Sequence, residues 1–337
     1  MHTALIRHRD CLLHDMGQHH PESPDRLHAV EDQLIASGLI GYLLECEAPV
    51  VTREQLARVH SEDYLEALDA SVPARGLVHL DPDTAMNPNS LDAARRAAGA
   101  VVHATDLVLR AEAQNAFCCV RPPGHHAERR AFGGFCYLNN AAVAAHYFSR
   151  YGRVAVLDVD YHHGNGTQDI FWTRSDVLTI SIHGHPSFAY PYFSGFADEV
   201  GEGAGKGFNL NLPLPESVDP ETYRAALAAA LNRIERFQPA FVLLSLGYDT
   251  AAGDPTGSWR HRPADFRKIG EAVGALGYPT LVVQEGGYRT RTLGTNARAF
   301  FTGLWDSGHK TPLRSPRRPA RATPVPMPAA AQLQGAT

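Results

Sequence analysis

The chain lacks any uninterrupted apolar stretch of about 20 residues and any apolar segment typical of a secretory signal. These absences argue against a membrane-spanning helix and against export, so we expect a cytoplasmic protein. Cysteine is scarce, with 5 residues and no Cys-x-x-Cys pair. We therefore interpret the cysteines as reduced core residues, including the adjacent Cys118 and Cys119 in an apolar run.

The chain also lacks the basic excess that is typical of nucleic-acid-binding proteins. Its formal net charge is −5 at pH 7, and residues 308–337 carry five basic side chains and no acidic one, which leaves −10 on residues 1–307. We expect no direct nucleic-acid partner. An acidic body suits a cationic substrate, although ordinary solubility charge explains the same excess.

The sequence has no internal repeat, and its composition changes once. With 337 residues and 44% hydrophobic content, the chain is long enough for one large core. Beyond about Ser307 it becomes rich in Pro, Ala, Arg and Thr, which is typical of segments that do not pack. We predict one folded catalytic domain over residues 1–307 and a disordered tail over residues 308–337.

Apolar runs alternate with helical segments along the folded part. The runs 116–120, 154–157, 240–246 and 280–284 are typical of buried parallel strands. Helices are expected over 90–112, capped by Ser90, over 220–237 after Asp219, and over 263–277. This order predicts an α/β protein: a single-domain, open, mostly parallel sheet with helices on both faces.

Polar side chains follow each of these runs. Asp158, Asp160 and His162 come at the end of one run, and side chains that alternate along a strand would all point the same way. Two carboxylates beside an imidazole repel one another unless a cation lies among them, and this donor set suits zinc. A solvated polar strand end is the alternative. His125, Asp249 and Glu285 follow the other runs, so all four strand ends are predicted to converge on one crevice.

Five blocks of the sequence resemble the signature blocks of the histone deacetylase and acetylpolyamine amidohydrolase superfamily. They span residues 121–127, 133–140, 158–167, 247–249 and 285–288, and the resemblance runs from about His19 to about Leu304. Asn165, and Glu285 before Gly286, resemble the class II branch and its bacterial members. The resemblance implies an arginase/deacetylase-like fold and hydrolysis of an acetyl-amine bond.

The resemblance also implies a role for each site residue. It implies that Asp160, His162 and Asp249 hold zinc, with ferrous iron as the alternative metal. His126 would act as general base and acid, His125 would tune the electrostatics, and Tyr288 would donate a hydrogen bond to the oxyanion. Asn165 would orient His126, and Asp158 would support His125. A structural K⁺ or Na⁺ would be bound by Asp158, Asp160, His162, Ser181 and Ile182.

A substrate channel is implied by the same resemblance. Gly134, Phe135 and Tyr190 match its walls, with tyrosine at 190 where phenylalanine is usual, and Asp83 matches a rim acid of the bacterial enzymes. We expect His163 to bond locally rather than to bind metal. His183 and His185 are placed near the rim, where contact with substrate and local hydrogen bonding are both open.

The leading hypothesis is therefore a metal-dependent deacetylase that acts on an acetylpolyamine or on protein acetyl-lysine. An arginase-like ureohydrolase is a second hypothesis, but Gly164 stands where a bridging carboxylate would be needed. A catalytically silent acetyl-lysine-binding module is a third, which the full set of catalytic residues disfavours. The sequence does not decide the natural substrate, the acyl chain length, the metal, the role of the tail or the oligomeric state, for which a homodimer is one candidate.

Overall fold

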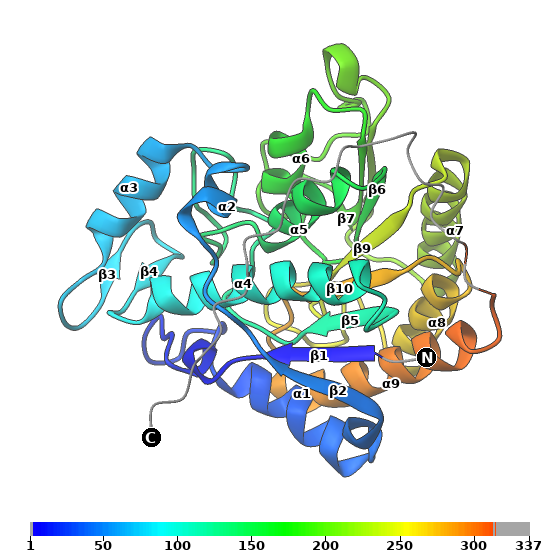
Figure 1. Cartoon of the computed structure of the whole chain (residues 1–337), viewed down its shortest axis with the longest axis horizontal. Helices are drawn as coiled ribbons and strands as arrows, with labels where there is room; N and C mark the ends of the chain where they lie inside the picture. Colours follow the sequence, from blue (N-terminus) through cyan, green and yellow to red (C-terminus); the bar gives the residue numbers. More distant parts are fainter. Residues whose placement is uncertain (1–2, 313, 315–337) are drawn as a thin grey trace, which may run out of the picture.

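The protein is built on one sheet of eight parallel strands (Figure 1). The computed structural model describes residues 3–312 and 314. In spatial order the strands are β2 (Leu43–Glu47), β1 (Thr3–Arg7), β5 (Asn115–Cys118), β10 (Thr280–Gln284), β9 (Phe241–Leu246), β6 (Val154–Asp158), β7 (Val177–Gly184) and β8 (Asn209–Leu214). Two short strands, β3 (Val78–His79) and β4 (Ala85–Met86), form a separate antiparallel pair. The predicted open parallel sheet is confirmed.

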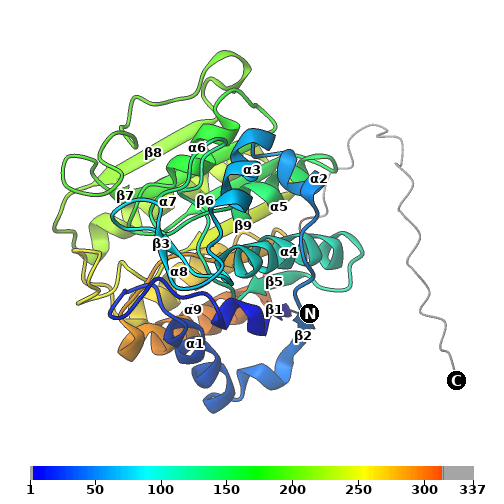
Figure 2. The ribbon, with the colours of Figure 1, turned by 90° about the vertical axis from the view of Figure 1, so that its left-hand side faces the viewer.

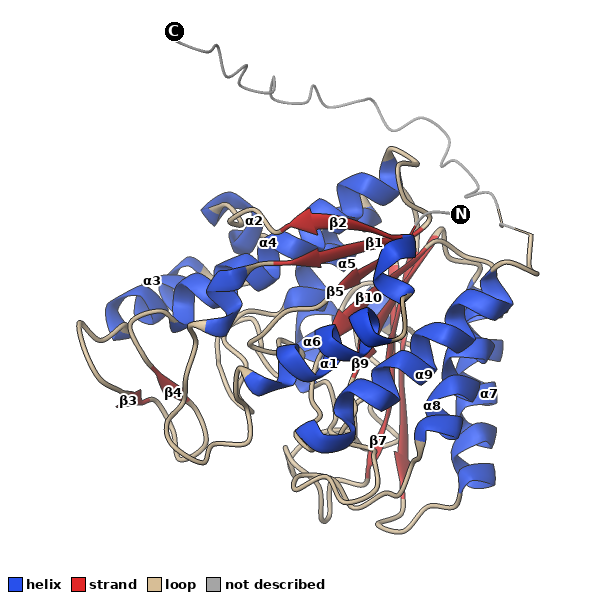
Figure 3. Ribbon diagram, turned by 90° about the horizontal axis from the view of Figure 1, so that it is seen from below, coloured by secondary structure: helices blue, strands red, loops and turns tan. Residues whose placement is uncertain are grey.

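Helices cover both faces of this sheet. One face packs against α4 (Ser90–Leu109), α5 (Asn140–Ser149) and α6 (Asn165–Phe171). The other carries α1 (Asp25–Ala36), α7 (Pro220–Phe237), α8 (Pro263–Gly274) and α9 (Thr290–Gly308), which lie together in Figure 3. The remaining helices are α2 (Arg53–Ala57) and α3 (Glu62–Ser71), with short 3-10 turns at η1 (Arg9–Leu12), η2 (Leu39–Tyr42) and η3 (Gly203–Gly205).

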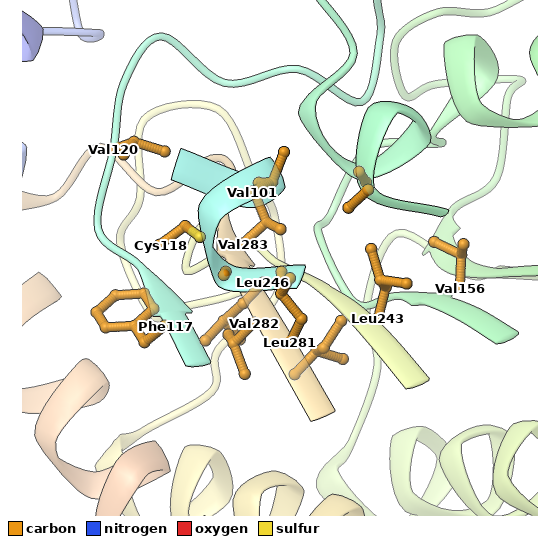
Figure 4. Packing of buried hydrophobic residues seen from close by; sticks show 14 of the residues in the cluster. Val101, Phe117, Cys118, Val120, Val156, Leu243, Leu246, Leu281, Val282 and Val283 are labelled. Carbon is orange, nitrogen blue, oxygen red and sulfur yellow. The ribbon is translucent and has the colours of Figure 1, made fainter. Parts of the chain in front are cut away.

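The central strands are buried along their whole length. Every residue of β6, β9 and β10 is buried, as expected for parallel strands that are covered on both faces. Phe117, Leu243 and Val282 belong to this core (Figure 4), and the Phe117 ring packs against Phe301 of α9 at 4.3 Å between centroids. All five cysteines are free, and four of them are buried, while Cys46 is partly exposed. Burial raises the pKa of the Cys118 thiol, which keeps it protonated.

The helix starts were predicted with mixed success. Asp219 caps α7 by accepting hydrogen bonds from the backbone of Glu221 and Thr222, with proline at the first helical position. The expected cap of α4 is wrong: Asn89 is the N-cap residue, and Ser90 is the first helical residue. The Ser90 hydroxyl instead accepts from the Asn87 backbone and hydrogen-bonds to His14.

The carboxyl ends of the strands all face one side of the molecule. Figure 1 shows β1 and β5 pointing toward this side, and Figure 2 views the molecule from it, with long loops in front of the sheet. No helix in the described part of the chain is long and apolar enough to cross a membrane. Helix α9 continues to Gly308, one residue beyond the predicted domain boundary. Of the tail predicted over 308–337, the structure describes residues 308–312 and 314, and the rest lies outside the described residues.

Candidate active site

Asp160, His162 and Asp249 meet in one cluster at this edge. One ligand atom from each lies within 4.8 Å of the others. The His162 Nδ1 atom is 3.2 Å from Asp160 Oδ1 and 3.0 Å from Asp249 Oδ2, and both carboxylates are fully buried. The residues come together because β6 and β9 are hydrogen-bonded neighbours in register, with Asp158 opposite Ser245.

The prediction about strand alternation at this cluster is wrong in one respect. Strand β6 ends at Asp158, so Asp160 and His162 lie in the loop that follows it. Asp158 accordingly lies outside the cluster: its Oδ2 is 2.8 Å from His125 Nδ1, and its Oδ1 accepts from the Asp160 backbone. This contact places Asp158 behind His125.

The electrostatics of the cluster favour a bound cation. Burial, together with the charge of Asp160, raises the pKa of Asp249 to about 8. Although burial opposes it, the neighbouring His125 and His162 hold the pKa of Asp160 well below its usual range. Burial likewise opposes protonation of His162, yet its hydrogen bonds to the two carboxylates raise its pKa to about 10. Two buried carboxylates that compete for one imidazole fit a divalent ion, which would let both ionise.

His126 lies beside this cluster, and Asn165 orients it. The His126 ring is 4.0 Å from that of His125 and 6.0 Å from that of His162, measured between centroids. Its Nδ1 is 2.7 Å from Oδ1 of Asn165, the first residue of α6. Burial and the adjacent His125 and His162 hold the pKa of His126 well below its usual range, so the ring is neutral and can accept a proton.

Tyr288 reaches the site from the loop after β10. The backbone N–H groups of Tyr288 and Arg289 donate to Asp254 Oδ2 at 2.7 and 3.0 Å. The guanidinium carbon of Arg26 lies 4.7 Å from the centroid of the Tyr288 ring, and Arg26 Nε donates to the Gly287 carbonyl at 2.7 Å. Burial raises the pKa of the Tyr288 hydroxyl well above its usual value, which preserves it as a hydrogen-bond donor.

The expected channel residues surround His126 and Tyr288. The Tyr190 ring packs edge-on against His126, with 4.8 Å between centroids, and Phe135 packs in the same way against Tyr288 at 5.5 Å. Gly134 has φ +52°, and a Cβ atom there would lie 2.3 Å from the His126 ring. Only glycine therefore allows the chain to pass this close to the histidine.

Asp83 is exposed and lies beside this channel. His20 connects the two, because its Nε2 is 3.1 Å from the Asp83 carbonyl and its ring packs edge-on against Phe135 at 4.8 Å. The hydroxyl of the next residue, Thr84, accepts from the Phe135 backbone at 3.3 Å. The loop that carries Asp83 is thus attached to one wall of the channel.

The other histidines bond locally. His163 hydrogen-bonds to Ser194 and Gln168, as expected for a residue that does not bind the metal. His183 is fully buried between Ser181 and the Gly195 carbonyl, which removes it from the rim. His185 bonds to Ser187.

A small polar cavity lies behind Asp158. Its volume is about 10 Å³, and Asp158, Gly164, Thr179, Ser181 and Asn209 are among the residues that line it. Of the residues expected to bind a monovalent cation, Asp158 and Ser181 line this cavity, and Ile182 follows Ser181 in β7. The cavity is large enough for one water-sized particle.

A buried set of charges supports the site and was missed in the sequence. Arg121, directly before the Pro-Pro-Gly-His-His turn, binds Glu22 in a bidentate pair at 2.8 and 2.6 Å. Glu22 also binds Arg26 at 2.9 Å. Glu285 accepts from the backbone N–H groups of Gly124 and His125 at 2.7 and 3.1 Å. An acid and a base four residues apart, such as Glu22 and Arg26, are also typical of exposed helices, so their spacing gave no signal of burial.

The comparisons with known proteins agree with this geometry. Residues 20–304 match the model of the histone deacetylase domain. Acetylpolyamine amidohydrolase 2 of Pseudomonas aeruginosa is 41% identical over 86% of this chain and 93% of its own length. Among solved structures, the HD domain of HDA15 has a TM-score of 0.85 at 37% identity, covering 90% of each chain. An acetylpolyamine aminohydrolase from Burkholderia pseudomallei has a TM-score of 0.82 at 35% identity, covering 91% of this chain and 99% of its own. The chain therefore belongs to the histone deacetylase domain family and is a metal-dependent deacetylase of acylated amines.

Proposed function

We propose that the protein removes the acetyl group from acetylated polyamines and that its metal is zinc, held by Asp160, His162 and Asp249. The observation that carries the proposed substrate is the position of acidic side chains beside the aromatic channel. Asp83 is exposed on a loop that contacts Phe135, because the hydroxyl of the next residue, Thr84, accepts from the Phe135 backbone at 3.3 Å. Carboxylates at the rim attract the free ammonium groups that a polyamine carries and that a neutral acyl chain lacks.

The donor set supports one divalent ion. Two carboxylate oxygens and one imidazole nitrogen are the ligands of a catalytic zinc site that keeps a position open. When bound, such an ion polarises the amide carbonyl and makes a water molecule more acidic. Ferrous iron accepts the same ligands and is the alternative metal.

The protein's own residues supply the proton transfers. Neutral His126, held by Asn165 at 2.7 Å, takes a proton from the attacking water and returns it to the leaving amine. The protonated hydroxyl of Tyr288 donates a hydrogen bond to the oxyanion that develops on the carbonyl. The rings of Phe135 and Tyr190 hold the methylene chain of the substrate between apolar faces.

His125 has a different role from its neighbour. Burial opposes its protonation, but the charges of Asp158 and Asp160 raise its pKa well above the usual value. A charged His125 beside neutral His126 keeps the second imidazole from protonating prematurely. A K⁺ or Na⁺ in the polar cavity would balance the charge of Asp158 from the opposite side.

A second candidate substrate is acetyl-lysine in a protein. The 38% identity to Histone deacetylase 15 of Arabidopsis thaliana, over 90% of this chain, favours it. The ureohydrolase alternative is not favoured, because it needs a bridging aspartate at position 164. A Cβ atom there would lie 2.4 Å from Asp158 Oδ2, so the site has no room for that side chain. Location in the cytoplasm and assembly into a homodimer stay predictions.

A panel of substrates tests the proposal. We would measure kcat/KM for acetylputrescine, acetylcadaverine, acetylspermidine, an acetyl-lysine peptide and longer acyl-lysine peptides. The kcat/KM for the acetylpolyamines should be about tenfold or more above that for the peptides, because the carboxylates at the rim attract the free ammonium groups of a polyamine. Higher kcat/KM for an acyl-lysine peptide would instead identify a protein deacylase.

A further inference from the structure

The Asn165 side chain hydrogen-bonds to two residues, His126 through its oxygen and Glu128 through its nitrogen. Its Oδ1 is 2.7 Å from His126 Nδ1, while its Nδ2 donates to Glu128 Oε1 at 2.8 Å. A weaker contact of 3.4 Å joins Nδ2 to the His126 carbonyl. Glu128 belongs to the turn that follows the histidine pair and is partly exposed.

The partners on the Nδ2 side decide which way the amide faces. An ionised carboxylate and a carbonyl only accept hydrogen bonds, so the NH₂ group must point at them and the oxygen must point at His126. An amide oxygen cannot donate. Nδ1 of a neutral His126 must therefore carry the ring proton, which leaves Nε2 with the lone pair that a general base needs.

Glu128 itself is fixed in place by its backbone. Its N–H donates to the Ala131 carbonyl at 2.8 Å, and its carbonyl accepts from His60 Nδ1 at 2.9 Å. His60 has this orientation because its Nε2 accepts from the Asn139 backbone at 3.0 Å. The carboxylate is thus presented to Asn165 from a rigid turn rather than from a flexible surface loop.

We propose that Glu128 is a positioning residue, which selects the amide orientation of Asn165 and thereby the base-competent tautomer of His126. The inference rests on the proposed role of His126 as the base. Without Glu128, the long contact to the His126 carbonyl is the remaining restraint on the amide. The flipped amide would then donate to Nδ1 and favour the tautomer whose Nε2 already bears a proton.

Kinetics of four single variants and one double variant test this assignment. Glu128→Ala should lower kcat about tenfold with KM nearly unchanged, the scale of one hydrogen bond to a charged group. Glu128→Gln should recover most of the loss, because its amide oxygen can accept from Asn165. Asp169→Asn removes another nearby carboxylate that contacts the Arg129 backbone and not Asn165, and it is the matched control. An aspartate at position 165 accepts with either oxygen, so Asn165→Asp has no amide orientation for Glu128 to select. Adding Glu128→Ala to Asn165→Asp should therefore cause no further loss of kcat.

A spectroscopic readout separates positioning from general damage. Long-range ¹H–¹⁵N spectra of the metal-free protein, with the His126 signal assigned by its absence in His126→Ala, should show the Nδ1–H form in the wild type. They should show an increased share of Nε2–H in Glu128→Ala.

Three results would overturn the proposal: normal kcat in Glu128→Ala, equal losses in Glu128→Gln and Glu128→Ala, or an unchanged tautomer. A normal turnover in His126→Ala would instead show that His126 is not the base. This result separates a failure of the proposed base from a failure of the proposed role of Glu128.

Discussion

Replacing Tyr288 by phenylalanine removes one hydroxyl group and keeps the ring. The ring packs against Phe135 at 5.5 Å between centroids and under Arg26 at 4.7 Å. The loop is held through its backbone, by the two hydrogen bonds from Tyr288 and Arg289 to Asp254. None of these contacts uses the hydroxyl, so the variant should fold, retain its metal and bind substrate.

The expected loss follows from the role of the hydroxyl as one oxyanion donor. Such a donor contributes about 3–4 kcal/mol to the stability of the transition state, or about 10²–10³-fold in kcat. The raised pKa of Tyr288 means that the hydroxyl is protonated at the pH of any ordinary assay, so the loss should not depend on pH. KM should change little, because the interaction forms as the oxyanion develops.

Tyr190→Phe provides the matched control, since it removes a hydroxyl from the same channel without touching the proposed oxyanion position. Steady-state kinetics on the best substrate of the panel, with metal content measured for each variant, would compare the two. Tyr288→Phe with turnover near that of the wild type, or with its metal lost, would refute the assignment. An equal fall in both variants would point to a general effect of channel polarity.

Three further predictions concern the metal, the rim and the buried carboxyl. Metal analysis should find about one divalent ion per chain, lost in Asp249→Ala and His162→Ala with the fold retained; two tightly held ions would revive the ureohydrolase hypothesis. Asp83→Asn should raise KM for acetylpolyamines about fivefold, a loss near 1 kcal/mol that shrinks at high salt and spares neutral substrates; equal losses on both would make Asp83 structural. Burial raises the pKa of Glu285 from 4.5 to about 7, so its stabilising contribution is complete below pH 4.5 and is lost as the pH rises through 7. In the metal-free wild type, the unfolding free energy should fall as the pH rises from 4.5 to 7, and in Glu285→Gln this fall should be smaller by about 3 kcal/mol. Denaturation at a series of pH values measures it, and the same pH profile in both proteins would contradict the raised pKa.

The residues that gather at the cluster could be predicted because strand ends are readable in a sequence. Largely apolar runs identify β6 and β9, and the first charged residues after each run are expected at the carboxyl edge of a parallel sheet. That rule predicted that Asp160 and Asp249, which are 89 positions apart in the sequence, lie close together in the fold. It could not show that β6 stops at Asp158, because strand ends depend on which backbone groups find partners in the folded sheet.

The supporting residues could not be predicted, because nothing local distinguishes them. Glu22 and Arg121 are 99 positions apart, and each belongs to a residue type that is usually exposed. Only the folded chain shows that they form a buried bidentate pair. Glu128 is similar: two arginines follow it in an evidently polar turn, and its contact with Asn165 depends on how α6 packs against that turn.

The two glycines before Tyr288 are required for different reasons. Gly287 adopts φ +113°, a conformation that favours glycine. Gly286, in contrast, is needed for space: a Cβ atom there would lie 2.5 Å from Asp249 Oδ2 and 2.6 Å from Asp160 Oδ2.

The backbone N–H of Gly286 uses this closeness, since it donates to Asp160 Oδ2 at 2.8 Å. Gly247, the residue after β9, approaches the same carboxylate, and a Cβ atom there would lie 2.2 Å from Asp160 Oδ2. Asp160 is therefore held between two glycine backbones as well as by its imidazole neighbour. Because any side chain at position 286 would displace both carboxylates, the glycine is as much a requirement of the metal cluster as the ligands themselves.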